Sequence, residues 1–177
     1  MPGTTDNFRV TIEPDAKDWT WVLDRRCPEC GYDASGVAAV DVADAVRANA
    51  VSWADVLRRG DVRERPRPSV WSPLEYACHV RDVFRLYDFR LALMLEQDDP
   101  LYPNWDQDST ALEDRYDEQD PSVVAPELAD AASAIAERFD SVQGRAVAPH
   151  RSPQRRCVVH RRHLRPLLPA RRHPPPP

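Results

Sequence analysis

Three long stretches of the chain repeat apolar residues every three or four positions, which is the pattern of amphipathic helices. The longest stretch covers residues 71–96. Its apolar positions are Leu74, Ala77, Val80, Phe84, Tyr87, Leu91 and Met94. Serine caps helices, proline fits the first helical position and glutamate at the third completes a capping box, so Ser72, Pro73 and Glu75 mark its start. The pattern predicts a helix of about six turns.

The other two stretches predict helices on either side of the first. Residues 41–59 carry a stripe formed by Val42, Val46, Ala50, Trp53 and Val56 or Leu57. The last helix begins near Asp120 as its cap, with Pro126 close enough to the start to be tolerated. Its stripe is Val124, Leu128, Ala131, Ile135, Phe139 and Val142. No segment shows a convincing strand pattern, so we expect an all-α fold, in which three such helices need a fourth to close a four-helix bundle.

The segments between these helices are polar. We expect residues 1–18 to be poorly packed, residues 19–23 to lie against the core, and residues 61–70, with their prolines and charges, to form a linker. Residues 97–120 are acidic and lack the glycine of a calcium loop, which predicts a solvated loop. Its aromatic residues would anchor it, and a lid over a site is the alternative.

The distribution of charged residues along the chain changes near residue 145. Residues 145–177 hold nine arginines, no acidic residue and eight of the 18 prolines, and all 29 acidic residues precede them. Without a helical period this stretch is expected to be a disordered tail after a helical domain at residues 19–144. A basic tail can bind phosphates non-specifically, but this one has no aromatic residue for base stacking, so nucleic acid is not an expected partner.

Composition also narrows the class of protein. No apolar run approaches the ~20 residues of a membrane span, and residues 1–17 lack the features of a signal peptide. Four cysteines without such a signal predict reduced thiols in the cytoplasm. Five glycines and no Gly-rich turn between a strand and a helix give no support to a methyltransferase.

Two groups of residues could carry chemistry. His79 is the only histidine in the first 149 residues, and Glu75 and Asp82 fall on the same side of its helix, where a carboxylate could orient the imidazole. A buried structural histidine is the alternative. Cys27 and Cys30, in C-P-E-C-G, form half of a zinc knuckle, but also fit a redox dithiol or a structural turn.

The segment W-S-P-L-E-Y-A-C-H-V-R-D resembles the second helix of the DinB-like (DinB/YfiT) superfamily of four-helix bundles. The upstream D-W-T-W-V-L-D-R-R-C-P-E-C-G-Y-D and the downstream P-N-W-D-Q-D are similar to an actinobacterial subgroup of it. The resemblance covers roughly residues 16–144. It implies a divalent metal ion, zinc or nickel, held by three histidines, of which His79 matches the first. The other two would form H-x-x-x-H on a last helix, and this sequence has no such motif.

Relatives in that superfamily include transferases and isomerases that use a low-molecular-weight thiol, mycothiol or bacillithiol. There the metal would act as a Lewis acid on a bound thiol or water. With His79 as the single surviving ligand, we expect no catalysis by this chain, and its small-molecule substrate is not specified. The rival interpretation is a non-catalytic bundle that acts through helix packing, as a homodimer or a stress-linked binding protein.

The tail itself suggests why the fourth helix is missing. Back-translation of residues 151–177 with one permissible choice of GC-rich codons, read one nucleotide later, gives a helical string that ends in H-x-x-x-H. We therefore interpret residues 145–177 as the product of a frame shift near residues 141–147. On this interpretation the metal-like spacing of Cys157, His160 and His163 is a coincidence.

Overall fold

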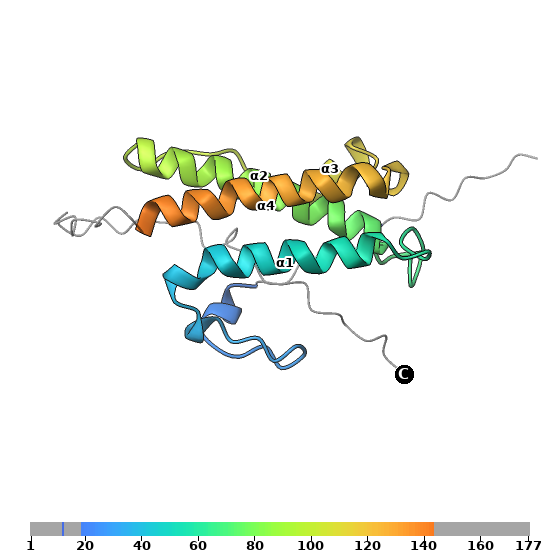
Figure 1. Ribbon diagram of the computed structural model, residues 1–177, viewed down its shortest axis with the longest axis horizontal. Helices are drawn as coiled ribbons and strands as arrows, with labels where there is room; N and C mark the ends of the chain where they lie inside the picture. Colours follow the sequence, from blue (N-terminus) through green and yellow to red (C-terminus); the bar gives the residue numbers. More distant parts are fainter. Residues whose placement is uncertain (1–11, 13–18, 144–177) are drawn as a thin grey trace, which may run out of the picture.

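A computed structural model describes residue 12 and residues 19–143, and every regular element in this part of the chain is helical (Figure 1). The α-helices are α1 (Val42–Leu57), α2 (Pro73–Glu96), α3 (Gln107–Glu113) and α4 (Pro121–Gln143). Short 3₁₀ turns lie at Trp19–Leu23, Ala34–Gly36, Ala39–Asp41 and Tyr116–Glu118. The all-α prediction is confirmed for these residues, and none of their helices has the length and apolarity to cross a bilayer. The predictions for residues 145–177, including the frame shift, lie outside the described residues, as do those for residues 1–18 except Ile12.

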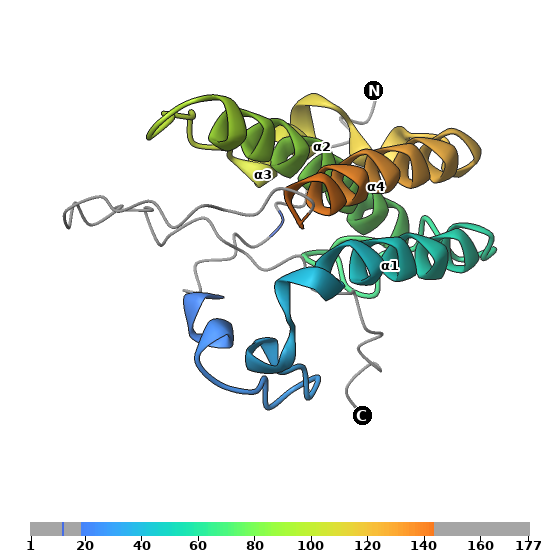
Figure 2. The same ribbon diagram turned by 60° about the vertical axis from the view of Figure 1, so that its left-hand side comes forward.

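Helix α4 is the centre of the packing. It lies between α1 and α2 and packs along both of them, whereas α1 and α2 contact each other much less (Figures 1 and 2). The side chains that α4 buries recur at helical spacing. They are Val124, Leu128, Ala131, Ala132, Ile135 and Ala136. The stripe predicted from the sequence therefore faces the core, and α4 joins the other two long helices into one hydrophobic cluster.

The start of α2 is fixed by the predicted capping box. The Ser72 hydroxyl accepts the Glu75 N–H, and the Glu75 carboxylate accepts the Ser72 N–H at 2.8 Å. Pro73 occupies the first helical position, where its missing N–H has no helical partner to lose. This end of the helix is buried, so the Glu75 N–H depends on the Ser72 hydroxyl rather than on water.

Replacing Ser72 by alanine tests this cap. We expect Ser72→Ala to lower the free energy of unfolding by about 0.5–2 kcal/mol, because a buried N–H loses its acceptor. Urea unfolding followed by circular dichroism measures the loss. Ser52→Ala, which removes an exposed hydroxyl within α1, is the control and should change stability by less than about 0.5 kcal/mol. Equal effects of the two changes would show that the cap contributes nothing.

Two segments expected to be irregular are ordered against α2. Residues 97–120 contain α3, which Asp106 caps by accepting the N–H groups of Asp108 and Ser109, so the prediction of a loop throughout is wrong. Seven residues are too few to show a helical stripe, which is why periodicity missed α3. Residues 61–70 are not a free linker either, because Val62 is buried and its carbonyl accepts the Leu74 N–H at 2.9 Å.

The end of α2 departs from its predicted stripe. Met94 is 46% exposed rather than packed in the core. Phe89 and Leu95 on the same half of the helix are exposed as well. The second half of α2 therefore leaves apolar side chains on the surface.

Candidate functional site

His79 lies in the second turn of α2 and is almost fully buried, with 6% of its surface exposed. Its imidazole stacks on Trp105, with ring centres 5.5 Å apart and planes at 8°. On another side Trp71 lies 5.2 Å away at a tilt of 50°. Residues 97–106, which follow α2, bring Trp105 back over the helix. Trp105 of this loop thus covers one face of the His79 ring, and the lid over a site stays a prediction.

The carboxylate of Glu75, one turn before His79, is held by three hydrogen bonds. Arg65 donates two hydrogen bonds to it, one of them at 2.9 Å, and the Ser72 N–H donates another. Burial alone would raise the pKa of Glu75, but these hydrogen bonds outweigh it and hold the pKa below the ordinary value. Glu75 is therefore a permanent anion paired with Arg65.

The carboxylate of Asp82, after His79, belongs to a second network. Arg81 donates to both its oxygens, at 2.8 and 3.1 Å, and the Tyr116 hydroxyl donates at 2.5 Å. Burial, together with the bond to Asp82, raises the pKa of Tyr116, so the phenol stays protonated and remains a donor. The prediction that Glu75 and Asp82 orient His79 stays a prediction, since each carboxylate also serves an arginine.

Arg81 connects this network to α4. It is 5% exposed, and its guanidinium also donates to Gln119 and Glu127, both at 2.8 Å. A buried guanidinium requires such neutralisation, because an unpaired charge in a protein interior is costly. The charged cluster next to His79 is thus satisfied within the protein.

Cys78, the neighbour of His79, is not poised as a metal ligand. Burial raises the pKa of its thiol to about 12, and its sulfur lies 3.4 Å from the Gln119 side-chain oxygen. Metal ligation requires the thiolate, which is disfavoured here. Across the described part of the chain, no three His, Cys, Asp or Glu side chains are grouped so as to hold a metal ion.

The other predicted pair, Cys27 and Cys30, lies apart from His79. Both residues belong to the loop between the 3₁₀ turns at Trp19–Leu23 and Ala34–Gly36, beside α1 and outside the layer of long helices (Figure 2). The structure therefore presents two separate candidate sites. Sequence reasoning missed the contacts of Trp71 and Trp105 with His79. Trp71 directly precedes the Ser72 cap, where an apolar residue packs back onto the first turns of a helix, so a local signal was present for it. Trp105 depends on a chain reversal after α2 and had no such signal.

Comparison with known proteins found no relative of this chain. No family model, curated protein or solved structure matches this chain.

Proposed function

We propose that this chain is a DinB-like helical bundle of the divalent-metal-dependent enzyme type, in which His79 is the remaining metal-ligand position. The observation that carries the proposal is the placement of His79, which is held within an aromatic cluster on the long second helix and covered by the loop that follows. The order of helices, with a long connection between α2 and α4, supports the same proposal. Its reduced cysteines suit a cytoplasmic protein.

The described residues do not complete a metal site around His79. Zinc sites in proteins use three or four side chains, and here one imidazole is accompanied by Glu75 and Asp82, which arginines already neutralise. In a complete site, zinc or nickel would supply a Lewis acid for a low-molecular-weight thiol. As it stands, the chain is a bundle of this type that binds metal weakly at His79 and does not catalyse.

Metal content tests the proposal. We expect a Cys27→Ser/Cys30→Ser protein, dialysed against zinc or nickel, to retain far less than one ion per chain. His79→Phe in that background should remove the little that remains, because phenylalanine keeps the stacking on Trp105 but has no nitrogen ligand. Inductively coupled plasma mass spectrometry gives the metal content, and circular dichroism confirms the fold.

Two results would contradict the proposal. Retention of nearly one ion per chain that His79→Phe abolishes would show a complete metal site, which catalysis requires and which the proposal denies. Equal metal content with and without the imidazole would show that His79 is a structural residue.

A non-catalytic interaction protein is the second candidate. The observation that favours it is the exposure of four apolar side chains, Phe89, Met94 and Leu95 on α2 and Leu101 after it, the last at 94%. Exposed apolar side chains can pack against a partner or against a second copy of the chain. Self-association lost on Phe89→Ser/Leu101→Ser but unaffected by His79→Phe would favour this candidate.

A further inference from the structure

The C-P-E-C-G segment folds into a closed loop. The Cys27 N–H donates to the Tyr32 carbonyl at 2.7 Å, and the Gly31 N–H donates to the Cys27 carbonyl at 2.9 Å. Gly31 has φ +73°, a left-handed conformation in which a side chain would be strained. The glycine after the second cysteine is thus what allows the chain to reverse and hold Cys27 and Cys30 on a single turn.

The two sulfur atoms lie next to each other in this loop. The pKa of the Cys27 thiol is below its ordinary value because its sulfur accepts a hydrogen bond from the Cys30 N–H, with further bonds from the Glu29 N–H and the Cys30 thiol. Both thiols are free. Backbone N–H groups directed at a sulfur favour the thiolate, which is the form that binds metal ions.

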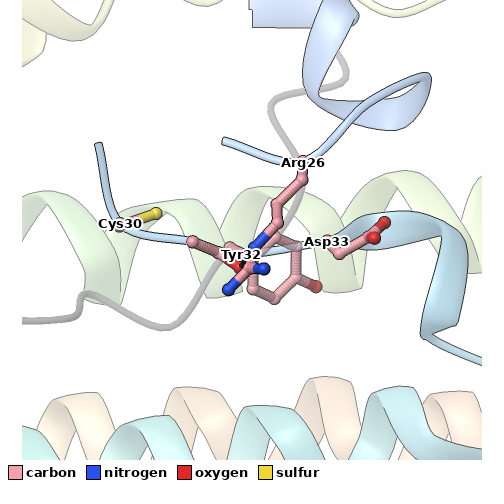
Figure 3. A pocket seen from close by; sticks show the side chains of 5 residues that line it. Arg26, Cys30, Tyr32 and Asp33 are labelled. Atoms are coloured by element: carbon pink, nitrogen blue, oxygen red, sulfur yellow. Dashed lines mark hydrogen bonds between the residues drawn. The ribbon is translucent and has the colours of Figure 1, made fainter. Parts of the chain in front are cut away.

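A cation lies beside the pair. A pocket of about 340 Å³ is lined by Arg26, Cys30, Gly31, Tyr32 and Asp33. Figure 3 shows Cys30 and Asp33 towards opposite ends of this pocket, with Arg26 and Tyr32 between them. Arg26 is fixed there by a 2.7 Å hydrogen bond from Nε to the Gly31 carbonyl. Its guanidinium lies against Gly31 and, after the hydrogen bonds from Ser35, contributes to the lowered pKa of Asp33.

The exposure of the two cysteines favours metal binding over thiol–disulfide exchange. Exchange needs an accessible attacking thiolate. Here Cys27, whose thiolate the N–H groups stabilise, is only 6% exposed, while Cys30 is the more accessible residue. This arrangement is the reverse of what attack on a disulfide requires, but it suits a thiolate held as a ligand.

We propose that Cys27 and Cys30 are two ligands of a zinc ion, and that the same pair from a second copy of the chain completes the tetrahedral site. Structural zinc takes four ligands, and the third cysteine of the described residues, Cys78, is buried elsewhere in the core. A two-fold axis through the zinc ion would provide four thiolates from identical loops. This inference goes beyond the proposed function and does not depend on it.

The position of the loop permits such a dimer. It projects from the long helices on the α1 side (Figures 1 and 2). Leu23 and Val37, which flank the cysteine loop in the sequence, are 46% and 36% exposed. These apolar side chains would be buried in the contact between two copies and would support the zinc site.

The test uses the full chain, expressed with added zinc and purified under reducing conditions. We expect one zinc ion per two chains by mass spectrometry and a dimer by multi-angle light scattering, which a chelator converts to monomer. Cys27→Ser and Cys30→Ser should each abolish both zinc and dimer while the helical circular dichroism stays unchanged. Cys78→Ser and Cys157→Ser are the matched controls and should retain zinc and dimer. Cobalt in place of zinc should give the thiolate charge-transfer band of a tetrahedral site with four sulfurs.

Three outcomes would overturn the proposal. The first is a protein without zinc, or with a Cys27–Cys30 disulfide that forms in preference to metal binding. The second is zinc retained by the Cys27→Ser/Cys30→Ser protein. The third is a monomer with one zinc ion per chain that Cys157→Ser abolishes, which would place the other ligands after residue 143. Zinc kept without Cys27 and Cys30 but lost on His79→Phe would overturn this proposal and contradict the proposed function as well, whereas loss of zinc from every protein tested would overturn this proposal alone.

Discussion

Arg81→Ala is expected to lower the free energy of unfolding by about 3–5 kcal/mol. The change removes a buried guanidinium that donates to Asp82, Gln119 and Glu127, and it leaves the Asp82 carboxylate with the half-exposed Arg85, at 3.4 Å, as its remaining cation. The Asp82 side chain is only 14% exposed, so water cannot replace the lost bonds fully. Urea unfolding monitored by circular dichroism, with the slope unchanged, measures the loss.

Arg85 provides the matched control. It donates to the same two carboxylates, at 3.4 Å to Asp82 and 3.3 Å to Glu127, but its side chain is 50% exposed. Exposed ion pairs contribute at most about 1 kcal/mol, so Arg85→Ala should have a small effect. If Arg81→Ala lowered the free energy of unfolding no more than Arg85→Ala, burial of Arg81 would not be the reason that this network stabilises the fold.

Ile135→Ala is the second large effect, with an expected loss of about 2–5 kcal/mol. Ile135 has no exposed surface and lies on the face of α4 that packs into the core, so alanine leaves a cavity there. The midpoint of urea unfolding reports the change. Val123→Ala, on the same helix but 51% exposed, should cost less than about 0.5 kcal/mol. Similar losses at the two positions would mean that α4 is not anchored by this face.

The long helices could be predicted from the sequence because their stability depends on a repeating apolar stripe. The stripe of α4 and the capping box of α2 are local patterns, and both are confirmed. Helix α3 could not be found in this way, because its start depends on one capping aspartate and its length spans two turns. Met94 continues the apolar spacing of α2 but is exposed, because apolar spacing within one helix does not predict where the helix packed against it ends.

The surroundings of His79 were only partly predictable. That its helix carries Glu75 and Asp82 on the same side follows from helical geometry. Helical geometry does not predict that Arg65 pairs with Glu75 or that Arg81 pairs with Asp82. Arg65 reaches Glu75 from the segment before the helix, and the position of Arg81 depends on its burial against α4. Partners brought together by chain reversals are set by the tertiary structure rather than by local spacing.

The central place of α4 has a consequence for synthesis on the ribosome. Helices α1 and α2 leave the ribosome first, but they contact each other too little to form a core by themselves. They must wait for residues 121–143, which at about 5–20 residues per second follow the end of α2 by several seconds. During that interval the apolar faces of both helices are uncovered and open to chaperones, until α4 emerges.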